Sequence, residues 1–287
     1  MKIIIERPGV PTVKLNVDVM TQSGTLSRQK SAVFILPGGP GADLSLYQKY
    51  ASLREISDVI FHDPRGCGQS GRGELSACNM DNYIDDVEAI RQHLGLDKIV
   101  VIGKSYGSMC ALGYALRYPH AVQKLVLSAG APSYRFLAKA KKNLQRLGTP
   151  EQINAAKKLW TGSFANNEEL LYYFCVTNNL YSVKALTQPE TFDLAQKARQ
   201  FSYDVLNEGF KHEFWHFDYE HELRRVLCPT LILAGRKDWI TDVELSEFMA
   251  TRIPYSQLQI FENASHAMEA DVPNAYFKAL IDFVGQK

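Results

Sequence analysis

The chain has 287 residues, enough to bury one large core, and its 32 basic and 31 acidic residues nearly cancel to a formal net charge of +1. This balance, without any run of five or more like charges, argues against a nucleic-acid or membrane-surface partner. The apolar stretch at the N-terminus is too short for a signal peptide and no later segment approaches the length of a membrane span, so we expect a soluble, cytoplasmic protein.

The first predicted elements are two paired strands. Residues 12–20 alternate between apolar and polar side chains, as a half-buried strand does, and Pro8-Gly9-Val10-Pro11 predicts a turn from an earlier Ile-rich strand. Short, continuously apolar runs then recur at residues 32–36, 58–61, 98–102, 124–127, 230–234 and 258–261. Strands this uniformly apolar are typical of a parallel sheet that is covered on both faces.

Helical segments separate most of these strands. Residues 81–94 are closed by Gly95, and residues 106–118 are closed by Pro119, both typical residues at a helix end. The alternation predicts βαβ units and an α/β fold with a mostly parallel central sheet flanked by helices.

The alternation of strands and helices is interrupted between Pro132 and Arg225, where we predict helices alone, for example at residues 136–147, 151–160 and 190–206. We therefore predict an α/β core of residues 1–131 and 226–287, with a helical cap inserted at residues 132–225. An insertion of this kind usually forms a lid above the strand ends, where ligands bind in an open α/β sheet.

The sharpest chemical signal is the pentapeptide Gly103-Lys104-Ser105-Tyr106-Gly107, which follows one predicted strand and opens the next helix. In a nucleophile elbow the turn is so tight that only very small residues fit on either side, and the serine hydroxyl is exposed at the helix N-terminus. We therefore predict that Ser105 is a catalytic nucleophile.

A serine hydroxyl needs a base to take its proton and a carboxylate to orient that base. An α/β hydrolase carries these groups in the chain order Ser, acid, His. Asp238 and His266 follow the last two predicted strands, at the same sheet edge as Ser105, so we predict the acid and the base there. Asp242 lies nearby, but residues 241–244 (Thr-Asp-Val-Glu) predict a capping box for the next helix.

The tetrahedral intermediate of acyl transfer carries a negative oxygen that fixed donors must meet. We expect the backbone N–H of Tyr106 and one from the glycine-rich turn Pro37-Gly38-Gly39-Pro40-Gly41, in particular that of Gly39. No metal-ligand spacing, Walker A or G-x-G-x-x-G pattern is present, so we expect no cofactor and no metal. The five cysteines are odd in number and lack a C-x-x-C pair, which predicts neither a disulfide framework nor a zinc site.

Several blocks together resemble the proline iminopeptidase (prolyl aminopeptidase) family. They are Leu36-Pro-Gly-Gly-Pro-Gly41, Asp63-Pro-Arg-Gly-Cys-Gly-Gln-Ser70, Gly103-Lys-Ser-Tyr-Gly-Ser108, the Asp238 loop and Asn263-Ala-Ser-His266. The resemblance implies an α/β hydrolase with a helical cap that removes an N-terminal residue, commonly proline, from peptides. It also implies that Asp63 and Arg65 hold a loop beside the site. The family's usual His-Gly-Gly-Pro-Gly begins here with Pro37.

An aminopeptidase must recognise a free, positively charged N-terminus, and in similar enzymes a glutamate of the cap does so. By this resemblance we assign amine binding to Glu208, with Glu213 and Asp218 as alternatives. Some relatives carry a second acidic residue directly after the catalytic aspartate, where this chain has Trp239. That indole would instead suit the wall of an apolar pocket for a proline ring or an acyl chain.

Three functions are compatible with these residues. The first is an aminopeptidase that releases N-terminal proline or another small apolar residue through an acyl-enzyme. The second is a cap-bearing carboxylesterase or amidase with the same triad, and the third is a non-catalytic binding protein, which would not require all three triad residues. The triad does not separate the first two, because many hydrolases share it. We expect a small-molecule or short-peptide substrate, and the sequence does not predict the oligomeric state.

Overall fold

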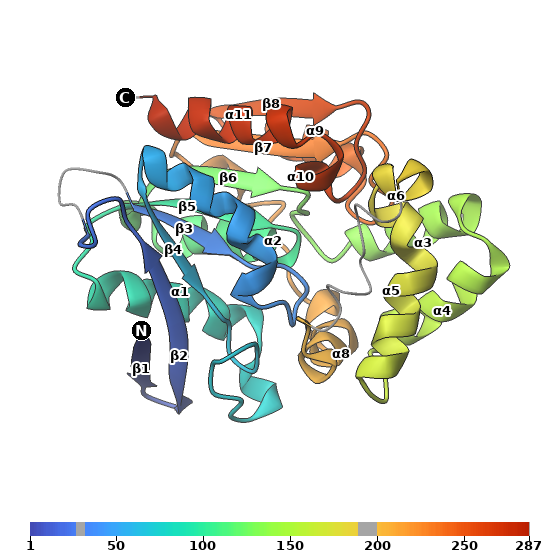
Figure 1. Cartoon of the computed structure of the whole chain (residues 1–287), viewed down its shortest axis with the longest axis horizontal. Coiled ribbons are helices and arrows are strands. Elements are labelled where there is room, and N and C mark those ends of the chain that lie inside the picture. The colour runs from blue at the N-terminus through green and yellow to red at the C-terminus, as the bar shows by residue number, and fades with distance from the viewer. Residues whose placement is uncertain (27–31, 189–199, 287) are drawn as a thin grey trace.

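The computed structural model describes residues 1–26, 32–188 and 200–286. Within them, one eight-stranded sheet has the order β1-β2-β4-β3-β5-β6-β7-β8 (Figure 1). The strands are β1 Lys2–Arg7, β2 Val10–Met20, β3 Ala32–Leu36, β4 Asp58–His62, β5 Ile99–Lys104, β6 Val122–Ser128, β7 Thr230–Gly235 and β8 Ser256–Phe261. Strand β2 pairs antiparallel with β1 and β4, and the remaining pairs are parallel. The predicted α/β-hydrolase sheet is therefore present.

Burial along the strands explains where they form. All residues of β3, β4, β5 and β7 are buried, as continuous apolar runs predict for strands covered on both faces. Strand β8 departs from that expectation, because its Gln257 and Gln259 are exposed. It is the edge strand of the sheet and pairs only with β7, and the face that carries these two glutamines is exposed to solvent.

Helices cover both faces of the sheet. They are α1 Met80–His93, α2 Tyr106–Arg117, α9 Val243–Ala250, α10 Met268–Asp271 and α11 Pro273–Gly285, with a 3₁₀ segment η1 at Leu44–Glu55. Phe34 and Leu36 of β3 pack in one hydrophobic cluster with residues of α1 and α2. Val33 and Ile35 point the other way and pack in a second cluster with residues of η1 and α11. The period of two along a strand thus divides the core into two layers.

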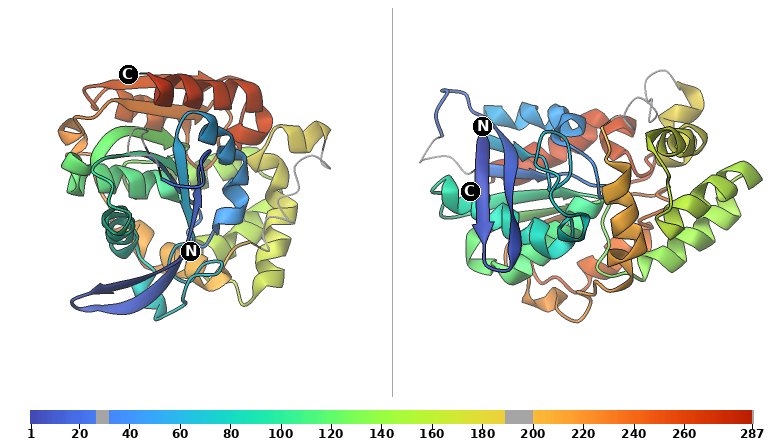
Figure 2. Two further views of the ribbon diagram at one scale, coloured as in Figure 1. Left: turned by 60° about the vertical axis from the view of Figure 1, so that its left-hand side comes forward. Right: turned by 90° about the horizontal axis from the view of Figure 1, so that it is seen from below.

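Five described α-helices lie between β6 and β7, and we call them the helical insertion. They are α3 Phe136–Leu147, α4 Pro150–Thr161, α5 Asn167–Tyr181, α6 Lys184–Thr187 and α8 Tyr203–Lys211. Figures 1 and 2 show them gathered beyond the ends of the parallel strands, to one side of the sheet. The prediction for residues 136–147 matches α3, whereas residues 190–199 of the helix predicted at 190–206 lie outside the described residues. No helix in the described ranges is long and apolar enough to cross a membrane.

Candidate active site

Ser105 lies between the end of β5 and the start of α2, in a backbone conformation that residues other than glycine rarely adopt. Its φ is 55° and its ψ is −122°. A Cβ atom on Gly103 would lie 2.2 Å from the carbonyl oxygen of Gly107, and one on Gly107 would lie 2.0 Å from that of Leu36. Both glycines are therefore required sterically, and the turn has the strand-turn-helix geometry of a nucleophile elbow.

His266 and Asp238 form a buried pair. The Nδ1 atom of His266 lies 2.7 Å from Oδ2 of Asp238, which leaves Nε2 as the ring nitrogen available to another group. The backbone N–H groups of Ile240 and Thr241 donate to Oδ1 of Asp238, at 2.9 and 3.0 Å, and the Thr241 hydroxyl donates to Oδ2 at 2.7 Å. Each oxygen of this buried carboxylate thus has partners that favour its charged form.

These contacts set the charge of Asp238. Burial alone would raise the pKa of its carboxyl group, but the His266 ring and the hydrogen bonds from His266 and Thr241 outweigh burial and hold that pKa below its usual value. Asp238 is therefore ionised at neutral pH, as a residue that stabilises an imidazolium must be.

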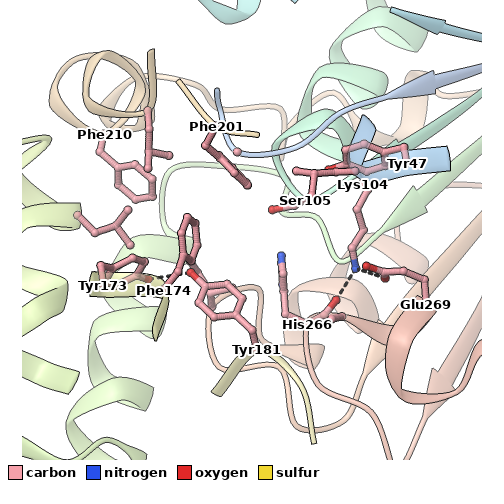
Figure 3. Close-up of a pocket in the computed structure, with 16 residues that line it drawn as sticks. Tyr47, Lys104, Ser105, Tyr173, Phe174, Tyr181, Phe201, Phe210, His266 and Glu269 are labelled. Carbon is pink, nitrogen blue, oxygen red and sulfur yellow. Dashed lines mark hydrogen bonds and ion pairs between the residues drawn. The ribbon is translucent and has the colours of Figure 1, made fainter. Parts of the chain in front are cut away.

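Ser105 and His266 line the same cavity, which has a volume of about 120 Å³. In Figure 3 the Ser105 hydroxyl and the far end of the His266 ring point toward each other across this space. The structure therefore brings together the three side chains predicted from chain order, one from the elbow and two from the loops after β7 and β8.

The glycine-rich turn after β3 packs directly on the elbow. A Cβ atom on Gly38 would lie 3.0 Å from the Cβ of Ser105, and Gly39, at a φ of +110°, lines the same cavity as Ser105. The Gly38 N–H already donates to the Tyr47 hydroxyl, at 2.7 Å. The candidate donor to an oxyanion is therefore the next N–H along the turn, that of Gly39. The N–H of Tyr106 belongs to the first turn of α2, where backbone donors have no acceptor within the helix.

The rest of the cavity is mostly apolar. Its aromatic and aliphatic lining residues are Leu46, Tyr47, Leu159, Tyr173, Phe174, Tyr181, Phe201, Leu206, Phe210 and Ile240. Most of them come from the segment between β6 and β7, so the helical insertion supplies one wall and the sheet side supplies Ser105. The charged residues among the described lining are Lys104 and Glu269, whose Nζ and Oε2 atoms lie 3.2 Å apart.

Comparison with known proteins agrees with this architecture. The family model for the α/β-hydrolase fold matches residues 31–268. A proline iminopeptidase of Saccharolobus solfataricus is 30% identical over 265 residues, which cover 88% of this chain and 84% of that protein. The chain belongs to the proline iminopeptidase family of α/β hydrolases.

Solved structures resemble this family member over nearly its full length. The proline iminopeptidase of Mycobacterium smegmatis has a TM-score of 0.76 at 19% identity, covering 99% of this chain and 97% of its own. An esterase from Exiguobacterium antarcticum has the same TM-score of 0.76 at 21% identity and covers 100% of both chains. At these identities the two structures support the fold alone, since peptidases and esterases share it.

In this member of the proline iminopeptidase family, the acidic residues assigned to amine binding lie outside the Ser105 cavity. Glu208, Glu213 and Asp218 line a second pocket, with Asp81 and Arg117, and are not among the described lining residues of the Ser105 cavity. Their role in substrate binding remains a prediction.

Each of these three carboxyl groups has its own surroundings. Glu208 lies on α8, with its Oε1 atom 4.0 Å from Nε2 of His212. Asp218 forms an ion pair of 2.6 Å with Arg135. Glu213 is partly buried and accepts hydrogen bonds from the Tyr106 hydroxyl and the Met80 N–H. Burial raises the pKa of Glu213 to about 7, although these hydrogen bonds oppose the shift.

Trp239 is 1% exposed and packs behind the cavity wall. Its ring centroid lies 5.5 Å from that of Tyr181, which lines the cavity, and 6.0 Å from that of Trp160. The indole thus supports a wall residue and is not itself among the lining residues described.

Two residues near the site were not found from the sequence. Thr241 stands three residues after Asp238, a spacing at which an aspartate often accepts local backbone N–H groups, and this signal was available. Lys104 stands inside the elbow pattern, but a pattern does not say where a long side chain ends. The capping box predicted at residues 241–244 differs in the structure: Asp242 is itself the N-cap of α9, where its carboxylate accepts the Glu244 N–H at 3.0 Å, because the Thr241 hydroxyl donates to Asp238 instead.

Asp63 and Arg65, which the resemblance implies hold a loop beside the site, are both buried. Asp63 accepts the backbone N–H groups of Leu44 and Gln69, and Arg65 donates twice to Asp86, so both residues hold loops together. Cys67, Cys78, Cys110 and Cys228 are free thiols. No group of three or more His, Cys, Asp or Glu side chains suited to a metal ion occurs within the ranges that the structure describes.

Proposed function

We propose that this protein is a serine hydrolase in which Ser105 is the nucleophile, His266 the general base and Asp238 the acid that orients the histidine. The observation that carries the proposal is the cavity shared by Ser105 and the His266 ring, with the Nδ1 atom of that ring held by Asp238 at 2.7 Å. Nucleophile, base and orienting acid thus follow one another in the order that acyl transfer needs.

The reaction follows from these positions. The Ser105 oxygen attacks the substrate carbonyl carbon while Nε2 of His266 takes its proton, and the N–H groups of Gly39 and Tyr106 stabilise the oxyanion. The bond to the leaving group breaks as His266 returns the proton to it, which leaves an acyl-enzyme on Ser105. A water molecule, deprotonated by His266, then attacks this ester and releases the acid product and the free serine.

For the substrate, we propose a peptide whose N-terminal proline or other small apolar residue is released. The relatives named proline iminopeptidase support this choice, and so does the apolar wall formed by residues such as Phe174 and Phe210. Burying an apolar ring against such a wall contributes on the order of 25 cal/mol per Å².

An ester or amide with an uncharged acyl group is the second candidate. Two observations favour it: Glu208 and Glu213 line a different pocket from Ser105, and Glu269, the acidic residue in the described lining, is paired with Lys104. The fold is also that of the Exiguobacterium esterase.

The nucleophile is tested by covalent labelling. A fluorophosphonate probe should label the native protein and leave Ser105→Ala unlabelled while that variant keeps its thermal unfolding temperature. Labelling of Ser105→Ala at the native rate would show that another residue reacts and would end the proposal.

The substrate class is tested by a small panel: a proline arylamide with a free N-terminus, its N-acetylated form and short p-nitrophenyl esters. An aminopeptidase should cleave the free arylamide and spare the acetylated one. If both arylamides are cleaved equally well, the exopeptidase proposal is wrong. If esters alone are cleaved, the second candidate is correct.

A further inference from the structure

Lys104, the residue directly before Ser105, has a buried ammonium group. The residue is 5% exposed, and lysines are rarely enclosed to this degree unless their charge is paired. Its Nζ atom lies 3.2 Å from Oε2 of Glu269 and donates a hydrogen bond to the backbone carbonyl of His266 (Figure 3). The side chain thus runs from the nucleophile strand to the loop that carries the base.

The loop around His266 is also anchored from two other directions. The Ala267 N–H donates to the carbonyl of Tyr181 at 2.8 Å, at the end of α5. The Ser265 hydroxyl is 2.6 Å from the carbonyl of Leu180 and 3.0 Å from that of Lys237, the neighbour of Asp238. These contacts tie the loop to the helical insertion and to the loop of the acid, but they do not tie it to the elbow.

The Lys104 contact supplies that third connection. Because Lys104 is bonded through the chain to Ser105, its ammonium relates the backbone of His266 directly to the backbone of the nucleophile. Glu269 lies three residues after His266, and its carboxylate compensates the charge of the Lys104 ammonium. Hydrogen bonds to an ammonium are stronger than neutral ones, so this contact restrains the loop more than a neutral donor would.

We propose that Lys104 is a positioning residue that holds the backbone of His266 at the correct distance from Ser105. The inference rests on the proposed triad and adds a residue that does not itself touch the substrate's reacting atoms. Positioning matters here because a displacement of about 1 Å between reacting groups costs a rate factor on the order of 100.

The test uses Lys104→Met in the full-length protein, since methionine keeps most of the length of the side chain and removes its charge and donors. We expect kcat to fall about 10-fold to 100-fold while KM changes by less than about 3-fold, because misplacement of the base affects the reaction more than ground-state binding. The rate of fluorophosphonate labelling should fall together with kcat. Lys104→Arg, which keeps charge and donors, should recover part of both.

Lys124 offers a matched control. It is a second buried lysine, on the neighbouring strand β6, and its Nζ donates to the carbonyls of Phe283 and Val284 at 2.8 and 3.2 Å, at the end of α11. Lys124→Met removes the same kind of contact without touching the candidate site. It should lower the unfolding temperature and leave kcat per folded molecule unchanged.

Two results would overturn the inference: Lys104→Met with native kcat and labelling rate, or equal losses in Lys104→Met and Lys124→Met that follow the folded fraction. Labelling that requires Ser105 in the native protein would in either case leave the proposed function standing. If the native protein is not labelled and Ser105→Ala stays active, the proposed function itself is wrong, and this inference is wrong with it.

Discussion

The Tyr106 hydroxyl donates a hydrogen bond of 2.8 Å to Oε2 of Glu213. This contact joins the residue that follows Ser105 to the segment between α8 and β7, so a carboxyl group of the second pocket lies directly behind the elbow. Because burial raises the pKa of Glu213 to about 7, its ionisation in the folded protein falls near neutral pH.

The Glu213 carboxyl group should therefore make stability depend on pH. Its pKa rises from 4.5 to about 7 on folding, so between these values the folded chain binds more protons than the unfolded chain. Its favourable contribution is fully present below pH 4.5 and is lost as the pH rises through 7, an effect of up to about 3 kcal/mol. Glu213→Gln should remove this dependence, so urea unfolding of both proteins between pH 5 and 8 should give a difference that changes with pH. Parallel curves would contradict the prediction.

Replacing Asp238 by asparagine should nearly abolish activity without unfolding the protein. An asparagine can present an N–H to Nδ1 of His266 and so favour the wrong tautomer, and kcat should fall by a factor on the order of 10⁴. Asp242→Asn is the control, because asparagine caps a helix as well as aspartate does, and its kcat should stay native. The measurement is kcat with the best substrate of the panel. An Asp238→Asn enzyme with more than a tenth of native kcat would contradict the assigned role.

Gly107→Ala should prevent normal folding of the elbow. The added Cβ would lie 2.0 Å from the Leu36 carbonyl oxygen and 2.5 Å from that of Pro37, so backbone atoms on the strand side must move. We expect a loss of more than about 4 kcal/mol in the free energy of unfolding. Gly285→Ala, where a Cβ meets nothing within 4 Å, should stay within about 0.5 kcal/mol of the native protein. Chemical denaturation of the two variants decides, and equal stability would refute the steric account of this glycine.

Glu208→Gln tests the residue assigned to amine binding by family resemblance. If Glu208 binds the N-terminal ammonium, kcat/KM for the free proline arylamide should fall about 10-fold to 100-fold, since a hydrogen bond to a charged group is worth roughly 1.5 to 3 kcal/mol. Cleavage of p-nitrophenyl esters should not change. Asp218→Asn, in the same second pocket, provides the comparison. A native arylamide-to-ester ratio in Glu208→Gln would remove this residue from the substrate site.

Local patterns were sufficient for the framework of the molecule. Every strand expected from an apolar run or an alternating segment occurs, with bounds within two residues of those expected. The reason is that the apolar runs of a doubly covered sheet and the glycines at 103 and 107 are requirements of the local backbone and its immediate neighbours. The contact between Asp238 and His266 followed from the rule that parallel strands end at one edge.

Tertiary structure alone decided which side chains surround Ser105. Nothing in the sequence distinguishes Phe174 and Phe210, which line the cavity, from Phe136, which belongs to the same buried cluster but is not among the described lining residues, because all three satisfy the same helical periodicity. In the same way, the pattern around Ser105 contains Lys104 but not the direction of its ammonium. Apolar periodicity states that a face is buried, and only the packing of distant helices determines whether it is buried against protein or against a cavity.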